Sequence, residues 1–262
     1  MTQRFGGLAA DVRGEAGAAP PLVLLHGLTF DRSTWGPVVH QLSLLEPSRL
    51  IVAFDLPGHG ESDAQDDYKT EAVVATLDRA VTEAGFSAPV MVGHSVSGVI
   101  ATLYAARHPT RGVVNVDQPL DATAFAELVQ SLEARLRGPE FAELWSMFET
   151  SLHLELLPGP EQQLVRSTMQ PRQDLVLGYW SQVFEVPIPT LNAMVDAALA
   201  EVRRRSVHYT FVSGSAVDPN YEEWLGVRLP EAQVVSWPNS GHFPQLAHPE
   251  AFARLLHQTA AW

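Results

Sequence analysis

Short apolar runs alternate with longer amphipathic stretches in the first half of the chain. Four runs predict strands, at residues 21–26, 50–54, 89–92 and 112–116. Strands that are apolar throughout are typical of a parallel sheet covered on both faces. Between them, residues 70–84 and 97–107 carry apolar side chains at helical spacing. Strands separated by helices of this length predict βαβ units and an α/β fold.

This alternation stops in the middle of the chain and then resumes. Residues 121–205 are helical in pattern, rich in large apolar side chains, and interrupted by the breakers LPGPE and VPIPT. Two more apolar runs, 207–212 and 233–237, and a final helix from Pro249 follow. We therefore predict one α/β core domain, residues 1–120 and 206–262, with a mainly parallel central sheet flanked by helices. A helical cap (lid), residues 121–205, is inserted into it.

Composition narrows the class of protein further. With 46% hydrophobic and 18% charged residues, the 262-residue chain has the composition of a packed globular protein. The formal net charge is −13, and the one basic cluster, Arg203 to Arg205, is too short for a nucleic-acid footprint. The absence of cysteine excludes disulfides and thiolate catalysis. No apolar segment has signal-peptide or membrane-spanning length, so we expect a soluble, cytoplasmic protein without nucleic-acid or membrane partners.

The motif Gly-His-Ser-Val-Ser-Gly, residues 93–98, directly follows a predicted strand and opens a helix. A serine on such a sharp turn exposes its hydroxyl, and the helix N-terminus favours negative charge beside it. Gly93 provides the small residue that the turn needs two positions before Ser95. Two positions after it, Ser97 stands where glycine is usual. The non-catalytic interpretation is a glycine-rich turn with Ser95 as a helix N-cap.

This strand–turn–helix motif around Ser95, which we call the elbow, resembles the nucleophile elbow of the α/β-hydrolase family. Three further motifs resemble those of the family and occur in the same order along the chain. His26-Gly27-Leu28 resembles its oxyanion loop, and residues 55–62 (DLPGHGES) resemble the loop after its next strand. Residues 239–243 (NSGHF) follow the last predicted strand, where the family keeps its catalytic histidine. The resemblance extends from about residue 21 to the C-terminus and is weakest in the cap. It implies the α/β-hydrolase fold.

The resemblance also implies roles for particular groups. Ser95 is the expected nucleophile, and the backbone N–H groups of Leu28 and Val96 are the expected oxyanion hole. His242 is the expected base, because it alone among the ten histidines follows the last predicted strand and is preceded by glycine, Gly241. No histidine spacing is typical of a metal site, so we expect neither a metal nor a cofactor.

Two aspartates compete for the third position of the triad. The family's usual acid lies in the loop after residues 207–212, which offers Asp218, but Asp218 before Pro219 is also a good helix N-cap. Asp117 ends an apolar strand, where a charge is costly unless it is paired. Zearalenone-lactonase-like enzymes have an acidic residue two before a proline here and a similar stretch after the catalytic histidine. We favour Asp117 and keep Asp218 as the alternative.

The predicted activity is acyl transfer through an acyl-enzyme. Ser95 excludes the dehalogenases and epoxide hydrolases of the family, which use aspartate at the elbow. We expect cap aromatics, together with His94, to contact a small hydrophobic ester or lactone, although each aromatic has an ordinary core role as its alternative. We expect a monomer or a homodimer. The predicted substrate contacts are His94, Trp145, Phe148, Tyr179, Trp180 and Phe184, with Met147 beside them.

Two other functions stay open at this point. The same triad can cleave a carbon–carbon bond, in which case Arg166 or Arg172 would hold a substrate carboxylate. A non-catalytic hydrolase-fold binding protein is the third possibility, although such a protein has no need of an intact Ser, His and Asp set.

Overall fold

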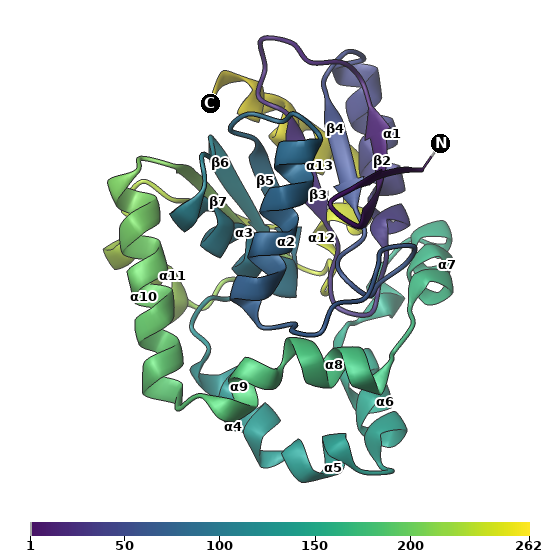
Figure 1. Ribbon diagram of the computed structural model, residues 1–262, viewed down its shortest axis with the longest axis vertical. Helices are drawn as coiled ribbons and strands as arrows, with labels where there is room; N and C mark the ends of the chain where they lie inside the picture. Colours follow the sequence, from purple (N-terminus) through teal and green to yellow (C-terminus); the bar gives the residue numbers. More distant parts are fainter. Residues whose placement is uncertain (1) are drawn as a thin grey trace.

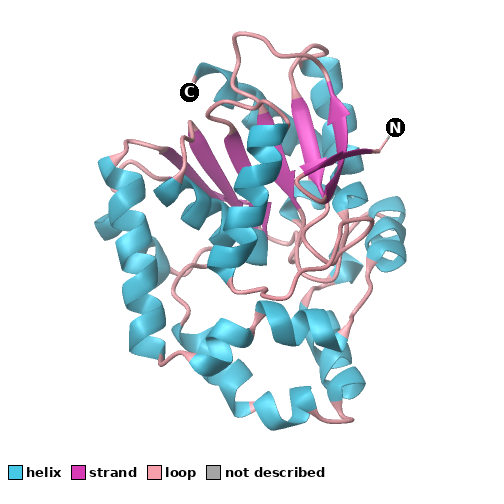
Figure 2. Cartoon of the chain, in the orientation of Figure 1, coloured by secondary structure: helices cyan, strands magenta, loops and turns pink. Residues whose placement is uncertain are grey.

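A computed structural model describes residues 2–262 and contains one eight-stranded sheet between layers of helices (Figures 1 and 2). The strand order is β1-β2-β4-β3-β5-β6-β7-β8. Strands β3 to β8 are parallel, and β1 and β2 join antiparallel beside β4. This confirms the predicted α/β-hydrolase fold with a mostly parallel sheet. The strands are β1 Gln3–Phe5, β2 Leu8–Arg13, β3 Leu22–Leu25, β4 Ile51–Phe54, β5 Val90–His94, β6 Gly112–Val116, β7 His208–Ser213 and β8 Gln233–Ser236.

The central strands β3 to β6 are buried on both faces, which explains why their sequences are apolar without alternation. In β3, Leu22 and Leu24 pack toward α1 and α13, whereas Val23 and Leu25 pack toward α2 and α3. Figure 1 shows α2 and α3 in front of the sheet and α1 and α13 behind it. The core helices are α1 Gly36–Leu45, α2 Thr70–Glu83, α3 Val96–Arg107, α11 Pro219–Arg228, α12 Pro244–Ala247 and α13 Pro249–Gln258, with short 3-10 turns η1 Arg32–Trp35 and η3 Thr259–Ala261.

Residues 121–205, which we call the cap segment, contain helices and 3-10 turns between the core strands β6 and β7. Most of these helices gather at one end of the sheet in Figure 1. Hydrogen bonds join the segment to loops at the carboxyl ends of the strands. Tyr179, Arg172 and Gln170 donate to backbone carbonyls of these loops, and Leu152 accepts the N–H of His242. The elements are α4 Thr123–Ser131, α5 Glu133–Arg137, α6 Phe141–Ser151, η2 Leu154–Leu156, α7 Gly159–Thr168, α8 Gln173–Tyr179, α9 Ser181–Glu185 and α10 Ile188–Arg204.

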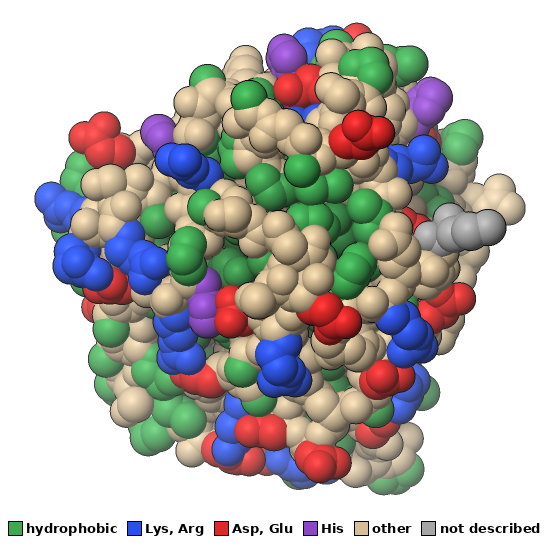
Figure 3. All heavy atoms as spheres, turned by 45° about the horizontal axis from the view of Figure 1, so that its top comes forward, with side chains coloured by type: hydrophobic (Ala, Val, Ile, Leu, Met, Phe, Trp, Pro, Cys, Tyr) green, Lys and Arg blue, Asp and Glu red, His purple; other side chains and the backbone are tan. Residues whose placement is uncertain are grey.

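Helix hydrophobicity and surface charge can be compared with the expectations on membrane and nucleic-acid partners. None of the helices in residues 2–262 is long and apolar enough to cross a bilayer. Acidic and basic side chains are interspersed over the face that Figure 3 displays, in keeping with the many exposed ion pairs such as Arg4–Asp63 and Arg254–Glu250.

Candidate active site

Ser95 lies on the sharp turn that joins β5 to α3. Its backbone has φ 55° and ψ −131°, an unfavourable conformation for a residue with a side chain. The turn is tight: a Cβ on Gly93 would overlap the carbonyl oxygen of Ser97, and a Cβ on Gly98 would overlap the Asn115 amide oxygen. Ser95 precedes the helix, but its hydroxyl makes no capping hydrogen bond. The side chain is half-buried and therefore accessible.

The structure brings His242 and Asp117 together. The distance from His242 Nδ1 to Asp117 Oδ2 is 2.9 Å, although 125 residues separate them in sequence. An ionised carboxylate only accepts hydrogen bonds, so this contact places the proton on Nδ1 and leaves Nε2 as a proton acceptor. That is the tautomer that a general base needs.

Asp117 is held from several sides. It has φ 54°, and its N–H donates to the Val212 carbonyl at 2.7 Å. Its second carboxylate oxygen accepts the N–H of Gly214 at 2.9 Å. Burial acts to raise the pKa of Asp117, but the hydrogen bonds from His242 and Gly214 outweigh it and lower the pKa below its usual value. The group is therefore a carboxylate beside the imidazole.

Asp218 lies elsewhere. It is exposed and is the N-cap of α11, where its carboxylate accepts the N–H of Asn220 at 2.9 Å. This is the helix-capping role that the Asp-Pro sequence indicates. Of the two candidate acids, the structure thus pairs Asp117 with His242.

His94 lies behind the His242 ring, with 4.7 Å between the two ring centroids. Its Nε2–H donates to the His242 carbonyl oxygen at 2.7 Å, and the side chain is buried. Burial, reinforced by the neighbouring His242, lowers the pKa of His94 to about 3. The predicted substrate contact of His94 stays a prediction; in the structure the neutral ring supports the backbone of His242.

The loop from His26 to Asp31, which we call the oxyanion loop, lies directly against the nucleophile. A Cβ on Gly27 would come 3.1 Å from the Cβ of Ser95, so a larger residue here would require Ser95 or the loop to shift. Leu28, whose N–H is predicted to belong to the oxyanion hole, is the next residue of this loop. Val96 is the first residue of α3, where backbone N–H groups have no partner within the helix. The arrangement suits stabilisation of the negative oxygen that forms on a carbonyl group attacked by Ser95.

Two buried histidines and Ser97 hold the oxyanion loop in place. His26 accepts the Leu56 N–H at 2.9 Å through Nε2, and its Nδ1 lies 2.7 Å from the Gly27 carbonyl oxygen. His59 accepts the N–H of Thr29 at 3.2 Å. Burial lowers the pKa of His26 to about 4 and that of His59 to about 3, so both rings are neutral. The sequence motifs indicate these two histidines as structural or site-lining.

Ser97 makes a contact that we did not predict from sequence. Its buried hydroxyl donates to the carbonyl oxygen of His26 at 2.5 Å. The bond ties the first turn of α3 to the oxyanion loop. The only sequence signal for it is the departure from glycine at this position.

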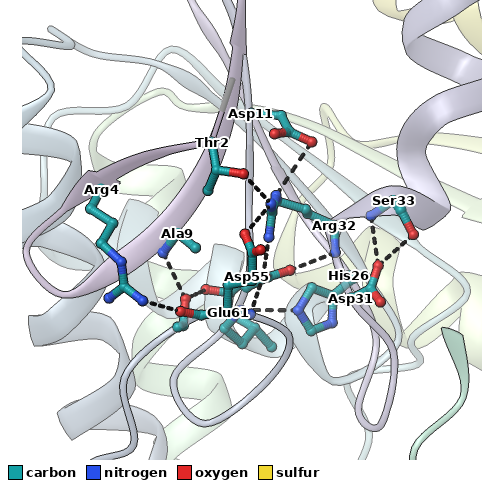
Figure 4. Close-up of polar contacts among 12 residues, drawn as sticks. Thr2, Arg4, Ala9, Asp11, His26, Asp31, Arg32, Ser33, Asp55 and Glu61 are labelled. Atoms are coloured by element: carbon teal, nitrogen blue, oxygen red, sulfur yellow. Dashed lines mark hydrogen bonds and ion pairs between the residues drawn. The ribbon is translucent and has the colours of Figure 1, made fainter.

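A network of charged groups joins the oxyanion loop to the loop after β4 (Figure 4). The guanidinium of Arg32 contacts the carboxylate of Asp55, which is fully buried, and also that of Glu61 at 2.6 Å. The backbone N–H groups of Arg32 and Glu61 donate to Asp55 at 2.8 Å each. These contacts position residues 55–62, which carry His59, against the oxyanion loop.

The cap aromatics form one cluster around Trp180. Trp145 and Phe148 lie 6.2 Å and 5.5 Å from it between ring centroids, and Phe125 lies at 5.4 Å. Tyr179 donates a hydrogen bond from its hydroxyl to the Pro57 carbonyl at 3.0 Å, so this hydroxyl already has a partner within the protein.

The remaining side chains named from the sequence are partly or fully exposed. Phe184 is half-buried beneath Arg137, whose guanidinium carbon is 5.1 Å from its ring. Met147 is exposed. Arg166 is exposed on α7, and Arg172 forms an ion pair with Asp174. In the part of the chain that the structure describes, no three His, Cys, Asp or Glu side chains are grouped so as to hold a metal ion.

The sequence matches the alpha/beta hydrolase family over residues 22–255, which includes every element described for the site. The chain belongs to the alpha/beta hydrolase family. This membership confirms the predicted fold and the predicted class of enzyme, a hydrolase. Family members share the sheet and the elbow, so the particular reaction must be inferred from the side chains at the site.

Individual relatives of this hydrolase carry different names. It is 28% identical over 251 residues to a pimeloyl-[acyl-carrier protein] methyl ester esterase of Chromobacterium violaceum, covering 92% of this chain and 94% of that one. It is 37% identical to epoxide hydrolase 4 of Mus musculus, but over 58% of this chain and 45% of that one. Among solved structures, a thermophilic esterase from Thermogutta terrifontis superposes with a TM-score of 0.71 at 20% identity, covering 98% of this chain and 97% of the other.

Proposed function

We propose that this hydrolase cleaves a hydrophobic carboxylic ester or lactone with a Ser95–His242–Asp117 triad. The observation that carries the proposal is the 2.9 Å contact between His242 Nδ1 and Asp117. Because Nδ1 is bonded to Asp117, Nε2 is the ring nitrogen that can accept the proton of a nucleophile on the elbow. Ser95, half-buried on the strained turn after β5, is that nucleophile.

In the first step the Ser95 oxygen attacks the carbonyl carbon of the ester, and His242 takes the hydroxyl proton. The carbonyl oxygen becomes an oxyanion, which the N–H groups of Leu28 and Val96 stabilise. The tetrahedral intermediate collapses, and the alcohol leaves with the proton from His242. Asp117 stays ionised and stabilises the imidazolium.

Water then attacks the acyl-enzyme. His242 removes a proton from the water, a second tetrahedral intermediate forms, and the acid product is released as Ser95 regains its proton. For a lactone, alcohol and acid belong to the same product molecule.

Three observations support an ester over the other substrates of related hydrolases. Serine at the elbow differs from the aspartate that epoxide hydrolases and dehalogenases of the family use. One relative that matches over nearly its whole length is named a methyl ester esterase. The cap segment contains an aromatic cluster around Trp180, and such apolar side chains suit a hydrophobic acyl or alcohol group.

The test compares three variants on a panel of aryl esters and hydrophobic lactones, zearalenone among them. Ser95→Ala removes the nucleophile and should abolish turnover. Asp117→Asn should lower kcat on the order of 10⁴-fold, because the amide no longer fixes the tautomer of the base. Asp218→Asn is the matched control: asparagine caps helices as well as aspartate, so activity and stability should be unchanged.

Two results would contradict the proposal. If Asp218→Asn loses activity and Asp117→Asn keeps it, the acid is misassigned. If the folded wild-type protein binds the compounds and cleaves none, a non-catalytic binding function replaces the enzymatic one.

A further inference from the structure

The main chain of His242 is held from two sides. Its carbonyl oxygen accepts the Nε2–H of His94 at 2.7 Å, and its N–H donates to the carbonyl oxygen of Leu152 at 3.1 Å. His94 belongs to β5 of the core, whereas Leu152 belongs to the cap segment and directly follows α6. The backbone that carries the predicted base is thus fixed in part by the core and in part by the cap segment.

Leu152 lies in a turn with an unusual backbone. The next residue, His153, has φ 53° and ψ 47°, the left-handed conformation that few residues other than glycine adopt. The φ of His153 sets the orientation of the peptide group that it shares with Leu152, and the oxygen that accepts the His242 N–H belongs to that group. Histidine adopts this conformation more often than most residues with a side chain. A residue that avoided it would turn the Leu152 carbonyl away from His242.

Gly241 fits against this turn. It also has a positive φ, 62°, and a Cβ on it would come 2.9 Å from the carbonyl oxygens of both Leu152 and His153. That distance is too short, so the turn or the loop that carries His242 would have to shift. Glycine before the base therefore makes room for the turn of the cap segment.

A buried apolar cluster joins the turn to the loop that carries His242. Phe243, the residue after His242, packs against Phe30 of the oxyanion loop, with 5.2 Å between the ring centroids. Leu154 and Leu157, which follow the turn, belong to the same cluster. The turn, the loop of the base and the oxyanion loop are therefore packed together.

We propose that the turn at Leu152 and His153 positions the catalytic base, with His153 as a positioning residue that acts through its backbone conformation. The turn fixes the N–H side of His242 while Asp117 fixes its ring, and together they aim Nε2 at Ser95. The inference rests on the proposed function, in which His242 is the base. It adds the cap segment to the groups that activate the nucleophile, whichever ester is the substrate.

The experiment replaces His153 with residues that tolerate the left-handed conformation to different degrees. In the series His153→Asn, His153→Ala and His153→Val this conformation becomes steadily less favourable, and the β-branched valine avoids it most. All three variants remove the imidazole and its exposed ion pair with Glu155, so the loss of that pair is common to them.

Labelling with a fluorophosphonate measures how far Ser95 is activated, without the need for a substrate. His153→Asn should be labelled within about 2-fold of the wild-type rate and His153→Val about 3- to 10-fold more slowly, the effect of one lost hydrogen bond. His153→Ala should lie between them and decides the point if the valine variant does not fold. For an ester that the protein hydrolyses, kcat should fall in the same order and KM should stay unchanged. Exchange of the His242 amide hydrogen should become faster in that order, because its bond to Leu152 is weakened.

The same three substitutions at Ser206 are the matched control. Ser206 is exposed and has the same φ of 53°, but it lies before the amino end of β7, whereas the triad lies at the carboxyl ends of the strands. These variants should lower the melting temperature about as much as their counterparts at His153. They should keep the wild-type labelling rate and kcat.

Three results would overturn the inference. Labelling of His153→Val at the wild-type rate would show that the base does not need the turn. An equal loss in Ser206→Val would show a general effect of destabilisation, and a rise in KM alone would place the turn in substrate binding. If the wild type is labelled but hydrolyses no ester, the proposed function fails and the labelling series alone decides the inference. If the wild type is not labelled, both fail.

Discussion

Ser97 stands where related elbows usually have glycine, and its hydroxyl donates to the His26 carbonyl. We predict that Ser97→Ala lowers kcat about 2- to 10-fold with little change in KM, because the oxyanion loop loses a bond that holds it against α3. Ser97→Gly should lose kcat equally and lower the free energy of unfolding by about 0.5–1 kcal/mol more than Ser97→Ala, since glycine is less favourable within a helix. Steady-state kinetics and urea denaturation check both. An effect on KM alone would show that the hydroxyl acts on substrate binding instead.

At the residue scale, sequence motifs indicated Ser95, His242 and the loop at His26 because each follows a strand directly. The choice between Asp117 and Asp218 could not be made from motifs alone, since both have a local reason to be acidic. It depends on strand register: β6 beside β7 places Asp117 next to Gly214 and within reach of His242. The Ser97 and Thr29 contacts were not predictable, because they depend on how two loops approach each other.

At the scale of elements, the Arg32–Asp55 pair joins the loops after β3 and β4 (Figure 4). We predict that Arg32→Ala lowers the free energy of unfolding by about 3–5 kcal/mol, because it leaves the buried carboxylate of Asp55 without its partner. Arg4→Ala is the control, since the Arg4–Asp63 pair is exposed and should contribute at most about 1 kcal/mol. Chemical denaturation measures both. Equal losses in the two variants would contradict a special role for the buried pair.

Most of the predicted strands differ from the observed ones by one or two residues at either end. The strands β1 and β2 were not predicted. These two strands lie at the edge of the sheet; β1 has only three residues, and the apolar residues of β2 are followed by the charged Asp11 and Arg13, so neither forms a continuous apolar run. The cap segment was predicted as helical, whereas its division into short helices was not. Contacts between this segment and core loops, such as that of Gln170 with Thr29, are not visible in any local sequence pattern.

For the whole molecule, three buried neutral histidines make stability depend on pH. The pKa values of His26, His59 and His94 are about 4, 3 and 3 in the fold, against about 6.5 when unfolded. Between these values the unfolded chain binds more protons than the folded one. The free energy of unfolding is therefore complete above about pH 6.5 and falls as the pH drops toward 4, by on the order of 1 kcal/mol per pH unit for each histidine.

Urea denaturation at pH 8 and at a series of pH values down to 5 measures this loss. Raised ionic strength serves as the control, because desolvation of buried rings is little affected by salt, whereas exposed ion pairs are screened. A midpoint that stays constant or rises as the pH is lowered would contradict the neutral state of these histidines.

The central claim, that Ser95 is a nucleophile activated by His242, is tested most directly by covalent labelling with a fluorophosphonate followed by mass spectrometry of the intact protein and its peptides. The account predicts one adduct on the wild-type protein, located at Ser95, and none on Ser95→Ala. Labelling of Asp117→Asn should be much slower, and that of Asp218→Asn should match the wild type. An unlabelled wild type, or an adduct that persists in Ser95→Ala, would contradict the claim.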